Sequence, residues 1–123
     1  MIKTEYDHIA PYVTKDQTLI RELLHPAVHG EGRTSLAEAV LAPGLVSELH
    51  LHEATEEIYH YTQGSGVMTL GVEKLDVRRG STVLIPPGTP HQVENTGDGD
   101  MRILCICSPP YSHEDTKLLQ RTP

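Results

Sequence analysis

The sequence predicts a small all-β domain, and three features of the chain lead to that prediction. Its 123 residues are close to the usual size of one domain, and nothing in the composition argues for a second. Ten Gly and nine Pro, with neither Trp nor Phe, suit a chain of many short elements separated by turns. Helical signals are weak until the C-terminus. We therefore expect one core built from short strands.

Short runs of β-branched and aliphatic residues recur from Thr18 onward. Gly, Pro, Asn or Asp separates most of them, at intervals typical of β-sandwiches and barrels. The predicted strands cover residues 18–24, 35–41, 46–52, 57–62, 67–72, 75–78, 82–85, 91–95 and 101–107. Nine such strands predict a barrel or a sandwich.

The two ends of the chain differ from this strand-rich middle. Ser112, followed three residues later by Asp115, offers an N-cap and predicts a short helix over residues 116–120. Residues 1–17 show neither the helical nor the strand periodicity of apolar residues. We expect them to form an arm with helical turns, packed on the barrel or on a second subunit. The predicted organisation is an N-terminal arm (1–17), a β-barrel (18–110), and a short C-terminal helix and tail (111–123).

Charge and hydropathy exclude several classes of partner. The formal net charge of -7 would repel a phosphate backbone, and the ten Lys and Arg residues are scattered, so nucleic acid is not an expected partner. The N-terminus lacks the apolar stretch of a signal peptide, and no segment approaches the ~18 apolar residues of a membrane span. We expect a soluble, cytoplasmic protein without a membrane partner.

The two cysteines, Cys105 and Cys107, lie two positions apart in a predicted strand. Their Cα atoms would be roughly 6.6 Å apart with parallel side chains, which is a poor geometry for a disulfide. We expect free thiols in a reducing compartment. Two interpretations stay open: small buried core residues, or a place beside a metal site or in redox chemistry.

Four residues with good metal-ligating groups stand at spacings that bring them together. Side chains alternate across a strand, so His50 and His52 project from one face of the strand predicted at 46–52. If Glu57 on the next strand faces them, His60 does not. His91 begins the strand predicted at 91–95 and is free to supply a third imidazole.

The turn before His91 contains Pro86, Pro87, Gly88 and Pro90. Proline leaves little backbone entropy to lose when the ligand is fixed, so this turn preorganises the imidazole. Three neutral imidazoles and one carboxylate suit one divalent transition metal ion per subunit, drawn from Fe, Mn, Ni, Co and Zn. An octahedral ion would keep about two positions open for water, dioxygen or a bidentate substrate.

These residues lie in two glycine-bounded frames. The first frame contains Gly44, His50, His52, Glu57 and Gly64, and the second contains Gly80, Pro86, Gly88, His91 and Asn95. Their spacing resembles the two motifs of the cupin superfamily at all ten signature positions, and the short segment between the frames resembles small bacterial single-domain cupins.

The cupin resemblance implies a small antiparallel β-barrel of jelly-roll type with the metal inside. It also implies the ligand set His50, His52, Glu57 and His91. The neighbouring Glu56 fits a shorter version of the first motif, but counting back from Gly64 selects Glu57, and Glu56 would point outward.

Three further residues are candidates for the pocket wall and for catalysis. Tyr59 and Tyr61 share the inward parity of Glu57, so each either packs the core or presents a hydroxyl to a substrate. Glu48 shares the parity of His50. It either lies at a solvated rim of the pocket, or forms a hydrogen bond with a metal-ligating residue, or transfers a proton.

A set of aliphatic side chains has the opposite, outward parity. It consists of Leu45, Leu49, Leu51 and Ile58. Exposed aliphatic patches of this kind usually mark an interface, so we expect a homodimer.

The expected function is that of a small metalloenzyme acting on an oxygen-rich small molecule. Fe or Mn would suit dioxygenase or decarboxylase chemistry, whereas Zn or Ni would suit isomerase, lyase or hydrolytic chemistry. A noncatalytic cupin that binds or senses a small molecule through its metal is the alternative. A storage cupin is disfavoured because it would not need a complete ligand set.

Overall fold

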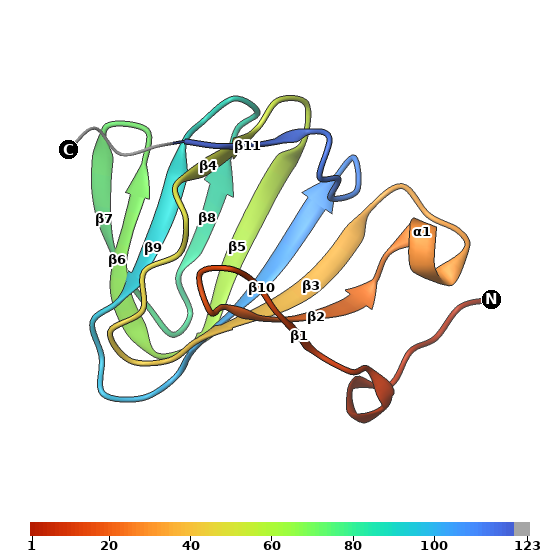
Figure 1. Cartoon of the computed structure of the whole chain (residues 1–123), viewed down its shortest axis with the longest axis horizontal. Coiled ribbons are helices and arrows are strands. Elements are labelled where there is room, and N and C mark those ends of the chain that lie inside the picture. The colour runs from red at the N-terminus through yellow and green to blue at the C-terminus, as the bar shows by residue number, and fades with distance from the viewer. Residues whose placement is uncertain (120–123) are drawn as a thin grey trace.

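The computed structural model describes residues 1–119, and its strands form two antiparallel sheets (Figure 1). The six-stranded sheet has the order β1 (Tyr12–Val13), β2 (Leu19–Leu24), β3 (Ser35–Leu41), β10 (Met101–Ser108), β5 (Glu56–Gln63) and β8 (Thr82–Ile85). The five-stranded sheet has the order β11 (Thr116–Leu118), β4 (His50–His52), β9 (His91–Asn95), β6 (Ser65–Leu70) and β7 (Glu73–Arg78).

The prediction of an all-β, jelly-roll fold with antiparallel strands is confirmed. Within residues 1–119, however, hydrogen bonds do not join the two sheets into a closed barrel. Helix is confined to η1 (Tyr6–His8) and α1 (Pro26–His29) in this part of the chain, and neither is long and apolar enough to cross a membrane. Sequence analysis did not predict α1.

The core lies between the two sheets. Tyr61 and Ile103 of the six-stranded sheet pack with Met68 and Val93 of the five-stranded sheet, and all four side chains are almost fully buried. In β5 the burial alternates as predicted, with Glu57, Tyr59 and Tyr61 inside. Strand alternation therefore determines which side chains reach the interior.

The predicted C-terminal helix is wrong over the described residues. Thr116–Leu118 forms β11, which pairs antiparallel with β4 and covers an edge that would otherwise be open. Asp115 does not support a helix start, because its carboxylate accepts hydrogen bonds from the backbone N–H groups of Ala54 and Thr55. Tertiary pairing overrides the local capping signal, and the last predicted helical residue, Gln120, lies outside the described residues.

The strand predicted at 46–52 is much shorter than expected, because only His50–His52 forms β4. Val46 makes an isolated bridge to Glu94, and the residues between it and His50 follow no strand alternation. The outward placement of Leu45 is therefore wrong, since its side chain packs against the core. Ile58 of the predicted patch is half-buried.

The N-terminal residues pack on their own chain. Tyr12–Val13 pairs with β2 and extends the six-stranded sheet. The Tyr6 hydroxyl donates a hydrogen bond to the Glu38 carboxylate, and the Arg21 guanidinium lies 4.6 Å from the centre of the Tyr6 ring. Such a contact adds a modest cation–π attraction to the hydrogen bond.

We predict that Gly66→Ala lowers the free energy of unfolding by about 1–3 kcal/mol, because overpacking forces backbone shifts. A Cβ at Gly66 would lie 2.1 Å from the carbonyl oxygen of Glu94 and 2.5 Å from Cε of Met101. Gly99→Ala is the control, since a Cβ there meets nothing within 4 Å. Urea unfolding measures both variants, and equal stability of the two would contradict the packing described here.

Candidate metal centre

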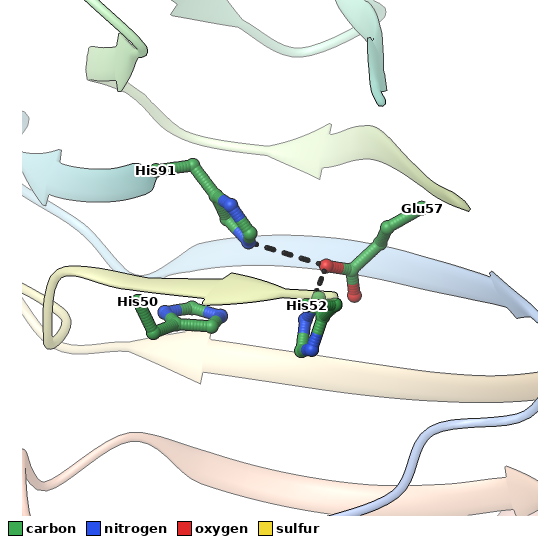
Figure 2. Close-up of side chains that lie close together, drawn as sticks. All are labelled: His50, His52, Glu57 and His91. Carbon is green, nitrogen blue, oxygen red and sulfur yellow. Dashed lines mark hydrogen bonds and ion pairs between the residues drawn. The ribbon is translucent and has the colours of Figure 1, made fainter. Parts of the chain in front are cut away.

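The four predicted ligands come together at one point between the sheets (Figure 2). His50 and His52 lie on β4, His91 lies on β9, and Glu57 reaches them from β5 of the other sheet. One ligand atom from each side chain lies within 4.8 Å of all the others. The site thus bridges the two sheets. Within the five-stranded sheet, His50 of β4 pairs directly with His91 of β9, which places these two ligands side by side.

Glu57 is the centre of these contacts. Its Oε1 lies 3.1 Å from Nε2 of His52 and 3.3 Å from Nε2 of His91. The His50 ring is 4.1 Å from the His91 ring, centre to centre. His52, Glu57 and His91 are buried, whereas His50 retains some exposure.

Backbone carbonyls determine the tautomers of His50 and His91. Nδ1 of His50 lies 2.8 Å from the carbonyl oxygen of Glu48, and Nδ1 of His91 lies 2.9 Å from that of Thr89. A carbonyl oxygen only accepts hydrogen bonds, so each Nδ1 carries the proton. In the neutral imidazole, each Nε2 then presents a lone pair to the centre.

A hydroxyl determines the tautomer of His52 in the same way. Nδ1 of His52 lies 2.9 Å from Oγ1 of Thr116, and that hydroxyl donates its proton to the carbonyl oxygen of Ser112 at 2.7 Å. Thr116 therefore accepts from Nδ1 of His52, because its own proton is already used. All three Nε2 lone pairs point toward the same space.

Such an arrangement needs a cation. Nε2 of His91 is buried without a hydrogen-bond partner, although it lies close to the Glu57 carboxylate. Lone pairs on nitrogen and on a carboxylate oxygen repel one another unless positive charge lies between them. One proton can satisfy only one of the three nitrogens, whereas a metal ion accepts lone pairs from all of them. The His50, His52, Glu57 and His91 cluster therefore fits a metal ion.

The protonation of the cluster agrees with this role. Burial lowers the pKa of His50 to about 4, with a further contribution from His91, so this imidazole is neutral at neutral pH. Burial alone would raise the pKa of Glu57, but when His52 and His91 are protonated at Nε2 as well, their hydrogen bonds and positive charge lower it to about 2; a bound metal ion would take the place of those protons. Neutral imidazoles and an ionised carboxylate are the states that bind metals.

Cys107 lies directly beside the cluster. Its Sγ is 3.2 Å from Oε2 of Glu57, so the thiol holds the carboxylate oxygen that does not contact His52 and His91. Burial, followed by the charge of Glu57, raises the pKa of Cys107, which keeps it a protonated donor. Cys107 and Cys105 are both free thiols, as expected.

A cavity of about 200 Å³ opens beside the cluster. It exists because three inward side chains of β3 are small, namely Ser35, Ala37 and Ala39; the fourth, Leu41, closes its end of the row. Tyr59 lines the cavity, with its ring 5.7 Å from the ring of His91. Glu48 also lines it, and the backbone carbonyl of Glu48 orients His50.

Other sequence-predicted residues lie away from the cavity. Tyr61 is fully buried in the core, and its hydroxyl donates to Sδ of Met68 at 3.4 Å instead of facing a ligand. Glu56 is exposed, as its outward parity predicted. His60 contacts the hydroxyl of Thr82 at 2.8 Å and takes no part in the cluster.

Sequence analysis missed the part of the cavity wall that comes from the two ends of the chain. This wall includes Tyr12, Asp16, Glu22 and Tyr111. The alternation of Thr18, Ile20 and Glu22 in one strand carried a signal that Glu22 faces inward. No comparable pattern marked Tyr111, because its backbone is held by contacts with Ser35 and His25, which are remote in sequence.

Comparison with known sequences identifies relatives. A family model described as a cupin domain matches residues 37–107. An uncharacterized protein of Methanocaldococcus jannaschii is 52% identical over 120 residues, which cover 98% of this chain and 96% of that protein. The oxalate-binding protein of Thermotoga maritima is 32% identical over 80 residues, or 65% of each chain.

Solved structures show the same likeness. A predicted oxalate decarboxylase from Thermotoga maritima matches with a TM-score of 0.78 and 26% identity, covering 89% of this chain and 99% of that one. The polyketide cyclase RemF from Streptomyces resistomycificus matches with a TM-score of 0.81 and 19% identity, covering 99% and 87%, which is a likeness of fold alone. With the family match spanning more than half of its length, the chain belongs to the cupin family.

Proposed function

We propose that this cupin binds one divalent transition metal ion through His50, His52, Glu57 and His91, and that it is an enzyme acting on an oxygen-rich small molecule. The ion would be Fe, Mn, Ni, Co or Zn. The observation that carries the proposal is the convergence of three Nε2 lone pairs on an ionised carboxylate. The adjoining cavity gives a small molecule access to that point.

The chain's own residues would bind and orient the substrate. When bound, the metal supplies Lewis acidity or, if it is redox-active, oxygen chemistry. Tyr59 presents an aromatic face beside His91, and the Glu48 carboxylate is a candidate for moving a proton at the cavity wall. The apolar side chains Ile20, Leu41 and Ile103, which also line the cavity, would help to exclude water from it.

The matches from Thermotoga maritima favour a small, oxygen-rich ligand. The sequence match from Thermotoga maritima is named for oxalate binding, and the matching structure from that organism is described as a predicted oxalate decarboxylase. Oxalate chelates through neighbouring oxygen atoms, which is the geometry that two open metal positions would accept. Decarboxylase or dioxygenase chemistry and isomerase or lyase chemistry both fit such a chelate.

The alternative is a noncatalytic cupin that holds or senses its ligand through the metal. The name of the oxalate-binding relative favours it. The two functions are separated by a turnover screen on the iron, manganese, nickel and zinc forms with oxygen uptake recorded. Oxygen-dependent turnover supports an oxygenase, oxygen-independent turnover supports an isomerase, lyase or decarboxylase, and saturable binding without turnover supports the alternative.

Charge and thiol chemistry support the kind of partner and the cellular compartment that we propose. A net charge of -7 disfavours nucleic acid, so the proposed partner is a small molecule. The free thiols Cys105 and Cys107 suit a reducing compartment, and we place the protein in the cytoplasm.

The outer face of the six-stranded sheet is our proposed homodimer interface. Ile58 lies opposite Ile106 of β10 and Leu84 of β8, and Ile106 lies opposite Leu36 of β3. These side chains form an apolar row across four strands, and Leu84 is 53% exposed. A second copy of the chain would bury this row.

We expect His50→Ala and His91→Ala to abolish retention of the metal, because each removes a ligand and leaves the Glu57 carboxylate incompletely neutralised. Elemental analysis of protein purified without added metal provides the measurement. His60→Ala is the matched control, since this imidazole lies on the outside of the same region and should leave the metal content unchanged. Metal that stayed bound in both ligand variants would refute the assignment.

Thr116→Val should weaken metal affinity about 10–100-fold, because it removes the acceptor that holds the His52 tautomer. Thr116→Ser keeps the hydroxyl and should bind the metal nearly as well as the wild type. Competition with a chelator of known affinity measures both. Equal affinities for the Val and Ser variants would show that the hydroxyl does not orient His52.

Sedimentation at micromolar concentration should show a dimer that Leu84→Arg converts to a monomer, because a charge would be buried at the proposed interface. Val72→Arg serves as the control, since Val72 is a fully exposed aliphatic residue in a turn. A monomeric wild-type protein would rule out the interface.

A further inference from the structure

Glu22 is a carboxylate that faces the cavity and takes no part in the metal cluster. It lies on the inner side of β2, opposite Ala37 of β3. Ala37 lies opposite Cys105 of β10, which in turn lies opposite Tyr59 of β5. Glu22 and Tyr59 therefore stand at the two ends of one row across the sheet, with small side chains between them.

This row spans the cavity from the metal side to the far wall. β2 and β5 are separated by two strands, so their backbones are roughly 14 Å apart at the usual strand spacing. The small side chain of Ala37 leaves the space between them open. A small molecule that contacts the metal cluster can therefore extend toward Glu22.

The Glu22 carboxylate has no hydrogen bond or ion pair with any side chain or backbone group among residues 1–119. Asp16, another acid of the cavity wall, differs in this respect, because it accepts from the Thr14 hydroxyl and from the backbone N–H groups of Thr18 and Glu48. Glu22 is half-buried, and this burial raises its pKa. A partly desolvated carboxylate without a partner gains strongly from a donor supplied by a ligand.

The charge of the cavity wall restricts the ligand further. Within residues 1–119, the wall contains Asp16, Glu22, Glu48 and Glu57 but no Lys or Arg. A second carboxylate or a phosphate on the ligand would meet these acids without a Lys or Arg of the wall to pair with, and the charges that favour an ionised Glu22 come only from His25, His29 and His113. A hydroxyl or an ammonium group would instead find an acceptor.

We propose, resting on the metal site proposed above, that the natural ligand is a neutral or cationic small molecule that presents two neighbouring oxygens to the metal and an O–H or N–H donor to Glu22. Glu22 is then a specificity-determining residue of the cavity. The oxalate relatives then share with this chain the chelation through neighbouring oxygens but not the charge of the ligand, and dianions such as oxalate would be poor ligands of this chain.

The test compares two chelators that differ only at the end facing Glu22. The zinc form of the full chain is titrated calorimetrically with 6-aminohexanohydroxamate, which ends in an ammonium group, and with heptanohydroxamate, which ends in a methyl group. The ammonium probe should bind about tenfold more tightly to the wild type, as expected for a charge-assisted hydrogen bond. Glu22→Gln should reduce this ratio to near one.

Two further variants make the result specific. Glu94→Gln removes the same charge from an exposed position outside the cavity and should preserve the preference for the ammonium probe. Glu22→Lys should reverse it and bind oxalate more tightly than the wild type does. Equal binding of both hydroxamates by the wild type, or tight oxalate binding unchanged by Glu22→Lys, would overturn the proposal.

Zinc content, measured on every sample, distinguishes a failure of the role proposed for Glu22 from a failure of the proposed metal site. Zinc-loaded protein that binds both hydroxamates without discrimination would overturn the role of Glu22 and leave the metal site intact. Protein that retains no zinc would overturn the proposed metal site, and the ligand assignment with it.

Discussion

The convergence of three imidazole lone pairs on the Glu57 carboxylate is the constraint on which the rest of the site depends. Each imidazole gives its Nδ1 proton to an oxygen outside the cluster, so each Nε2 is left to face inward. The buried Nε2 of His91 has no hydrogen-bond partner in return. A buried arrangement of this kind is costly without a cation, and the proposed metal ion removes that cost.

The two ends of the chain support this arrangement from opposite sides. At the C-terminal side, β11 pairs with β4 and brings Thr116 to Nδ1 of His52. At the N-terminal side, the Asp16 carboxylate accepts from the backbone N–H of Glu48, whose carbonyl accepts from Nδ1 of His50. The orientation of two imidazoles thus depends on segments that are remote in sequence, as is common for the outer partners of metal ligands.

The cavity is a consequence of side-chain size on β3. Ser35, Ala37 and Ala39 occupy inward positions that larger residues would fill, and the space they leave adjoins the cluster. The same strand carries larger residues, including Leu36 and Glu38, at the alternating outward positions. One strand therefore forms the floor of the cavity and part of the proposed dimer face. The acids around the cavity are the basis of the ligand class that we propose.

Sequence alone determined the all-β class, most strand positions and the inward placement of His52, Glu57 and His91, because strand alternation is a local property of the chain. It could not predict β11, since Thr116–Leu118 becomes a strand only by pairing with β4. The inward side of Leu45 was equally hidden, because the residues before His50 follow no alternation. Only the tertiary structure decided which side chains complete the cavity wall, among them Glu22 and Tyr111, because contacts between distant segments depend on how the sheets pack.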